Sequence, residues 1–203
     1  MFGSGGSDVA ARVARELGWS LLDNAVVDEV AARLGVSRSE VLAREERVPS
    51  LAERIAATMS MSTPEFVVPV PDTPITDTAE MRIVDVTKHV LEEAVQQGNA
   101  VLVGRGAQAM LADSPDALHV FCYAPRQFLV QYAIAHRGVS PANAGHEVDK
   151  INRQREQYVR RNWGRDWRAL ENYHLCVDTG RLGIERAADL VVAAARERFN
   201  LPS

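Results

Sequence analysis

The amino-acid sequence predicts an α/β protein with an open parallel sheet flanked by helices. Short runs of consecutive apolar residues, such as 100–103 and 120–123, are typical of strands that are buried on both faces. The longer segments between these runs repeat apolar residues every three or four positions, as helices with one buried face do. Strands that alternate with helices in this way are joined by right-handed crossovers and lie parallel in one sheet.

The composition fits one soluble globular domain. The chain has 203 residues, of which 46% are apolar and 25% charged, and its net charge of −4 argues against a general nucleic-acid coat. Cys122 and Cys176 both lie in apolar runs and resemble small buried side chains more than a disulfide framework. No apolar run approaches membrane-spanning length and no signal peptide is visible, so we expect a cytoplasmic protein without nucleic-acid or membrane partners.

The chain opens on a glycine-rich stretch, Gly3 to Asp8, that runs directly into a helix. The apolar residues of this helix recur at every fourth position from Val9 to Leu17. A glycine turn at a helix N-terminus presents unpaired N–H groups and often binds phosphate, although a flexible start before a helix is an equal alternative. The only lysines are Lys88 and Lys150, so the lysine of a P-loop is missing and any cation near a phosphate must be an arginine.

The first half of the chain contains a region that interrupts the alternation of strands and helices. A short strand over 19–23 ends in the carboxylate of Asp23, and a helix is expected over 25–34. Short helices continue to about residue 59 without a strand between them, as in an inserted lobe. Residues 62–78 hold four prolines together with apolar Phe66 to Val70, which indicates a non-helical flap over a site or a contact with a second subunit rather than an exposed linker.

The second half returns to a regular alternation of elements. After a helix over 79–97, the strand at 100–103 ends in Gly104-Arg105-Gly106, which places a cation where open α/β sheets bind ligands. The elements expected after it are a short helix over 107–111, a strand over 119–123, helices over 125–137 and 140–162, a strand over 173–179 and a last helix over 186–199.

Arginines gather near the end of the helix that begins at about residue 140. Residues 150–168 contain seven cations and only two carboxylates, within a chain whose total charge is negative. A charge run of this kind is often a solvated helix face. Because Tyr158, Trp163 and Trp167 lie among these cations, we favour a lid that closes over phosphates and excludes water.

Several motifs in order give the chain a more specific resemblance. They are Phe2-Gly3-Ser4-Gly5-Gly6, Leu21-Leu22-Asp23, Leu102-Val103-Gly104-Arg105, Phe121-Cys122-Tyr123-Ala124-Pro125, the stretch 152–158, Asn172-Tyr173-His174-Leu175, and the stretch 178–185. Together they resemble the cytidylate kinase-like family, whose members are relatives of the nucleoside monophosphate kinases.

The resemblance implies an adenylate-kinase-like, three-layer P-loop fold with a five-stranded parallel sheet. It implies a single domain over residues 1–203, with an NMP-binding lobe at about 24–78 and an arginine-rich lid at about 138–168. The implied reaction is transfer of the γ-phosphoryl group of ATP to CMP or a similar nucleotide, with Mg²⁺. A homodimer through residues 62–78 is a further expectation.

The resemblance also implies roles for particular residues. The residues implied for catalysis are Arg105, Arg155 and Arg161; those implied for the phosphates of ATP are Gly3, Ser4, Gly5, Gly6, Ser7, Asp8, Arg153 and Arg160; those implied for the acceptor are Asp23 and Arg105. A buried salt bridge is an equal alternative for Asp23. No residue is taken as a metal ligand, although Asp8 lies close to where a Mg²⁺ ligand would be.

The chain departs from the family pattern at several positions. The family's first strand is missing before Phe2, Leu129 and Tyr132 stand where relatives carry arginines, and Asn152 and Gly106 replace aspartates. Since electrostatic stabilisation is most of what such an enzyme contributes, these losses support an alternative: a catalytically degenerate nucleotide- or phosphate-binding protein that acts through partners.

Overall fold

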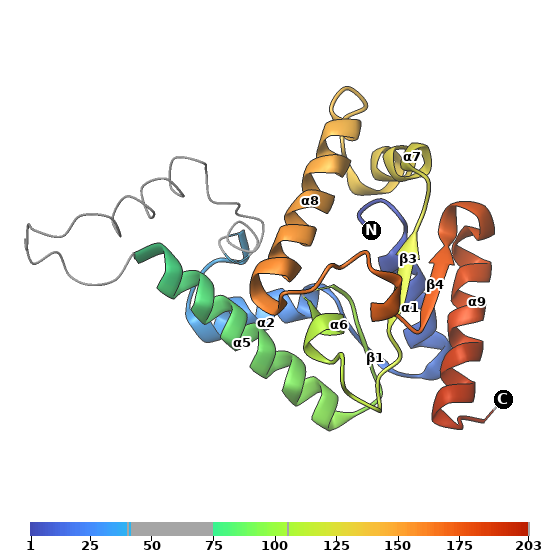
Figure 1. Cartoon of the computed structure of the whole chain (residues 1–203), viewed down its shortest axis with the longest axis horizontal. Coiled ribbons are helices and arrows are strands. Elements are labelled where there is room, and N and C mark those ends of the chain that lie inside the picture. Colours follow the sequence, from blue (N-terminus) through green and yellow to red (C-terminus); the bar gives the residue numbers. More distant parts are fainter. Residues whose placement is uncertain (40, 42–74, 105, 203) are drawn as a thin grey trace, which may run out of the picture.

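The computed structural model describes residues 1–39, 41, 75–104 and 106–202 (Figure 1). Its helices are α1 (Gly6–Leu17), α2 (Asn24–Leu34), α5 (Ile75–Gln97), α6 (Ala107–Met110), α7 (Arg126–Arg137), α8 (Ala144–Trp163) and α9 (Thr179–Phe199), with a 3₁₀ turn η1 (Leu170–Asn172). Its strands are β1 (Ser20–Leu22), β2 (Ala100–Leu102), β3 (Val120–Tyr123) and β4 (Leu175–Asp178). This alternation confirms the predicted α/β class.

The strands in the described part of the chain form two small parallel sheets, and not the expected single sheet of five strands. Strand β1 pairs with β2, and β3 pairs with β4, both in parallel. Among the described residues, those before α1 form a turn and not a fifth strand, because the amide of Ser4 donates to the carbonyl of Met1 at 3.2 Å. The amine of Met1 donates instead to the carbonyl of Cys122 in β3, at 2.7 Å.

Helices pack on both faces of β3. Val120 and Cys122 join a cluster with Val9 of α1 and Ala187 of α9, whereas Phe121 lies in a different cluster with Tyr158 of α8. This alternation follows from the two-residue period of a strand. Cys122 and Cys176 are half-buried free thiols, and burial raises the pKa of both.

A second body of helices covers the β1–β2 pair. Buried valines of α2 pack against Leu91 and Val90 of α5, with Leu22 of β1 and Leu102 of β2 at the edge of the same cluster. In Figure 1, α2 and α5 lie together on the side away from α9. None of the helices that the structure describes is both long and apolar enough to cross a bilayer.

Three helix starts differ from the sequence-based expectation. Helix α8 begins at Ala144, because the amide of Asn143 closes a turn onto the carbonyl of Ser140 at 3.1 Å. Helix α9 begins at Thr179, because the Asp178 carboxylate accepts from two backbone amides of the first turn; Gly183 then interrupts the helix with φ 77° and ψ 165°.

The third difference concerns the proline-rich stretch at 62–78. Residues 75–78 are helical because α5 extends to Ile75, so the expectation that the whole stretch is non-helical is wrong for these four residues. Residues 62–74, with the expected dimer contact, lie outside the described residues, as do Arg105 and most of the short helices expected before residue 59.

Candidate phosphate-binding site

The glycine-rich turn before α1 packs tightly against α7 and α9. Gly3 and Gly5 have φ angles of +82° and +72°, which L side chains rarely adopt. A Cβ on Gly3 would lie 2.9 Å from the carbonyl carbon of Leu129, and one on Gly5 would lie 3.2 Å from the Tyr132 ring and closer still to Ile184. The fold therefore requires glycine at both positions, whether or not a ligand binds.

The same turn leaves hydrogen-bond donors at the start of α1. The carbonyl of Gly5 accepts from the amides of Asp8 and Val9, at 3.0 Å each. The amides of Gly6 and Ser7, which precede them, have no hydrogen-bond partner among the residues that the structure describes. These two donors lie at the positive end of the helix dipole, so this end of α1 favours an anion.

The carboxylate of Asp8 is engaged by α7. Tyr132 donates its hydroxyl hydrogen to Asp8, and Nη2 of Arg137 lies 3.8 Å from the same carboxylate oxygen. Within the described part of the chain, no group of three or more histidine, cysteine, aspartate or glutamate side chains is arranged to hold a metal. Asp8 and its surroundings therefore do not fit a dedicated Mg²⁺ site.

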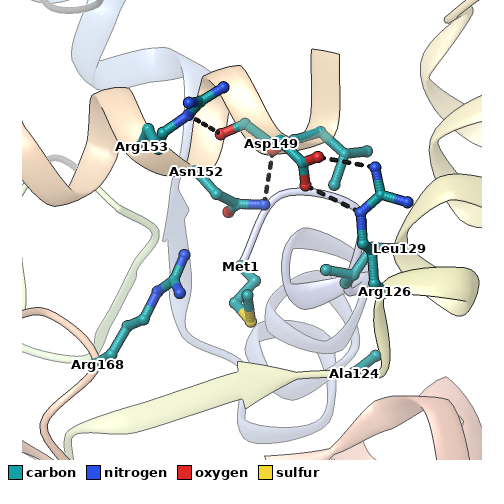
Figure 2. Close-up of a pocket in the computed structure, with 9 residues that line it drawn as sticks. Met1, Ala124, Arg126, Leu129, Asp149, Asn152, Arg153 and Arg168 are labelled. Carbon is teal, nitrogen blue, oxygen red and sulfur yellow. Dashed lines mark hydrogen bonds and ion pairs between the residues drawn. The ribbon is translucent and has the colours of Figure 1, made fainter. Parts of the chain in front are cut away.

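A cavity of about 420 Å³ lies beside the turn, between β3, α7 and α8 (Figure 2). Its lining comes from the N-terminus, the end of β3, both helices and the loop before η1, and consists of Met1, Ala124, Arg126, Leu129, Val148, Asp149, Asn152, Arg153 and Arg168. Because β3 and β4 are parallel, the cavity lies at the carboxyl end of their sheet, where open α/β folds bind ligands.

Asn152 holds the N-terminal segment against α8 at the edge of this cavity. The Asn152 side chain is buried; its Oδ1 accepts from the amide of Phe2 at 2.8 Å, and its Nδ2 donates to the carbonyl of Val148 at 2.9 Å. An amide can accept and donate at once, whereas an ionised carboxylate only accepts. The two bonds of Asn152 therefore require an amide and not an ionised carboxylate.

Three arginines from different elements reach the cavity. Arg126, at the start of α7, binds the Asp149 carboxylate through Nε at 3.2 Å and Nη2 at 2.7 Å. Arg153 of α8 donates its Nε to the backbone carbonyl of Asp149 at 3.3 Å. Figure 2 shows the Arg168 side chain extending from its loop towards Asn152 and Met1; its guanidinium lies 5.6 Å from the Trp167 ring and makes no hydrogen bond to a described residue.

The sequence identified only part of this lining. Arg153 was expected at ATP phosphates and does line the cavity, whereas Arg168 was counted in the charge run without a role. Sequence reasoning did not select Arg126. It could have done so, because Arg126 follows a buried strand closely, as Arg105 does, and that position was the reason for selecting Arg105. Nothing in the local sequence pointed to Asp149 as a site residue, because its partner Arg126 lies 23 residues away in the chain.

The other predicted lid arginines lie on α8 but outside the cavity lining. The guanidinium of Arg155 lies 5.8 Å from the Phe2 ring. Burial, and then the charge of Arg155, lowers the pKa of the Met1 amine to about 5. Arg160 pairs with Glu156 at 3.8 Å, and Arg161 is an exposed residue of the last turn.

Asp23 belongs to a different part of the molecule. It follows β1, where the amide of Val103 donates to the carbonyl of Leu22 at 3.0 Å, so it lies at the carboxyl end of the β1–β2 pair. The chain that follows Val103 leads within two residues to Arg105. The two residues expected to bind the acceptor are thus attached to neighbouring strands, although the structure does not describe Arg105 itself.

Comparison with known proteins supports the resemblance found in the sequence. The model of the cytidylate kinase-like family matches residues 1–181 of the chain. A uronate isomerase of Corynebacterium glutamicum is 31% identical over 119 residues, which are 57% of this chain but only 22% of that protein's length. An uncharacterised protein from Eubacterium ventriosum has a similar fold, with a TM-score of 0.65 and 18% identity over 96% of this chain and 92% of that one.

Proposed function

The chain belongs to the cytidylate kinase-like family, and on that premise we propose that it binds nucleotides through their phosphates and transfers the γ-phosphoryl group of ATP to CMP or a similar nucleotide. One observation carries the proposal: Arg126, Arg153 and Arg168 approach one cavity from three elements, and this cavity is also lined by Met1, which begins the segment that leads into α1. Guanidinium groups bind phosphate through paired N–H donors and neutralise charge in phosphoryl transfer.

We propose a division of roles between the two ends of the molecule. The donor phosphates would bind at the cavity and the glycine turn, with Arg153 and Arg168 closest and Arg155 beside them. The acceptor would bind at the carboxyl ends of β1 and β2, where Asp23 lies and Arg105 follows. Mg²⁺ would enter bound to the nucleotide's phosphate oxygens, because the Asp8 carboxylate is already engaged by α7.

A coupled assay of ADP formation tests the kinase proposal. ATP with Mg²⁺ would be offered together with a panel of nucleoside monophosphates, and the rate compared with Arg168→Ala and Arg105→Ala. We expect turnover on at least one pyrimidine monophosphate and a loss of at least about tenfold in each variant. Equal rates in the wild type and both variants, on every nucleotide, would refute the proposal.

A second function is favoured by the packing of α7 on the glycine turn. Leu129 and Tyr132 stand where the resemblance leads us to expect arginines; here the Leu129 side chain is buried in a cluster with Ala124 and Val148, and Tyr132 binds Asp8. A protein that has replaced phosphate-binding arginines with packing side chains could retain binding without catalysis. This alternative predicts a thermal shift with nucleotide and no ADP formation, so the two measurements together separate the candidates.

A further inference from the structure

The charged groups of the cavity are out of balance by two positive charges. The described lining holds three guanidinium groups and one carboxylate, that of Asp149. The Met1 amine adds nothing near neutral pH, because its pKa is lowered to about 5. A net charge of +2 balances a single terminal phosphate, which carries about −1.5 to −2 charges at pH 7.

Asp149 occupies the face of Arg126 that would otherwise bind phosphate. Its two carboxylate oxygens accept from Nε and Nη2 of the same guanidinium, at 3.2 and 2.7 Å. This two-bond geometry is the one in which arginine also binds a phosphate group. Arg126 makes a third bond, from Nη2 to the carbonyl of Gly145 at 3.3 Å, so its guanidinium lies against the first turn of α8.

The ion pair is open to exchange with a ligand. The side chains of Arg126 and Asp149 are 62% and 46% exposed, and water screens such pairs so that they stabilise a fold only weakly. A phosphate that enters the cavity can therefore bind Nε and Nη2 of Arg126 together only by displacing the carboxylate that already holds both atoms. The more phosphates a ligand carries, the more it gains from a freed guanidinium.

We propose that Asp149 is a specificity-determining residue of the phosphate-binding cavity, which withholds Arg126 and so limits the number of phosphates that the cavity binds. The inference rests on the proposed phosphate-binding function. It also explains the asymmetry among the three arginines: the guanidinium of Arg126 is held by a carboxylate, whereas the guanidinium groups of Arg153 and Arg168 form no ion pair with one among the described residues.

The test compares ligands that differ only in phosphate number. Calorimetry would measure the binding of AMP, ADP, ATP and inorganic tripolyphosphate to the wild type and to Asp149→Asn. We expect the variant to bind ATP and tripolyphosphate about five times more tightly, the effect of one unit charge at a partly screened site, and to bind AMP with a smaller gain. The matched control is Glu147→Gln, which removes a carboxylate from the same helix, paired with Lys150 and outside the cavity lining.

A double variant separates charge from fold. In Arg126→Gln/Asp149→Asn the cavity returns to a net charge of +2, so we expect wild-type affinity for ATP. Thermal unfolding of each variant checks that the fold survives without the Arg126–Asp149 ion pair between α7 and α8. If Asp149→Asn does not fold, Asp149→Glu takes its place: it retains the carboxylate, so we expect wild-type affinity for ATP. Affinities that are equal in Asp149→Asn, Glu147→Gln and the wild type would overturn the inference.

The outcomes also distinguish this inference from the kinase proposal. A gain in tripolyphosphate binding by Asp149→Asn without any ADP formation would support the role of Asp149 and refute the kinase. If the wild type forms ADP but Asp149→Asn binds ATP with the same affinity as the wild type, the kinase proposal would be supported and the role of Asp149 refuted. Absence of binding of all four ligands to both proteins would refute both.

Discussion

Replacing Gly3 with alanine tests whether the glycine turn is required by packing. At φ +82°, an alanine costs about 1–2 kcal/mol of backbone strain. Its Cβ would also lie 2.9 Å from the carbonyl carbon of Leu129 and 3.0 Å from its Cα, which are backbone atoms that cannot rotate away. Overpacking of this kind costs about 1–3 kcal/mol, so we expect Gly3→Ala to lower the free energy of unfolding by about 2–5 kcal/mol.

The control for this variant is Gly18→Ala at the end of α1. Gly18 has a similar φ of +68°, but a Cβ there meets nothing within 4 Å, so only the strain of about 1–2 kcal/mol applies. For a domain of this size, the difference of about 1–3 kcal/mol between the two variants corresponds to about 2–12 °C in Tm. Differential scanning calorimetry of both variants without ligand measures it.

The result that would refute this reasoning is an equal Tm for the two variants. Gly3 would then be free of the Leu129 contact, and its role would be to let a phosphate approach the backbone. In that case Gly3→Ala would lower nucleotide affinity without an additional loss of stability. Gly6→Ala extends the comparison, because its Cβ would lie at an ordinary 3.4 Å from that of Cys122 and we expect little change in Tm.

Three further predictions concern stability. Thr87→Val should raise the free energy of unfolding by about 1 kcal/mol in chemical denaturation, because the Thr87 side chain is buried and its Oγ1 has no partner among the described residues; a loss of stability would contradict this. Burial lowers the pKa of His119 below 6.5, so as the pH drops the unfolded chain binds the proton first, and the free energy of unfolding should fall between pH 6.5 and the folded-state pKa. His119→Gln should reduce this dependence of the unfolding free energy on pH, and an unchanged dependence would contradict the prediction. Arg12→Ala should lower the free energy of unfolding by about 1 kcal/mol, and less in high salt, because Arg12 joins α1 to α9 through Asp189 at 2.8 Å and through Glu185; an effect independent of salt would exclude the ionic explanation.

The arrangement of the cavity explains why sequence reasoning found some site residues and missed others. Arg153 stood out because it lies in a dense run of cations, a signal that is local in the sequence. Arg126 and Asp149 are 23 residues apart and meet only because α7 and α8 pack side by side. Tyr132 and Asp8 are 124 residues apart, so no local pattern could reveal that α7 binds the Asp8 carboxylate.

The sequence by itself determined the α/β class, the places of the four described strands and the family, although not the number of strands in the sheet, because runs of apolar residues and ordered motifs depend only on neighbours along the chain. It also determined that the glycines before α1 matter, but not why. Only the tertiary structure decided that Gly3 and Gly5 face the backbone of α7 and the side chain of Ile184, and that the strands form two pairs. These features depend on contacts between segments far apart in the chain, whose distances no local pattern of residues encodes.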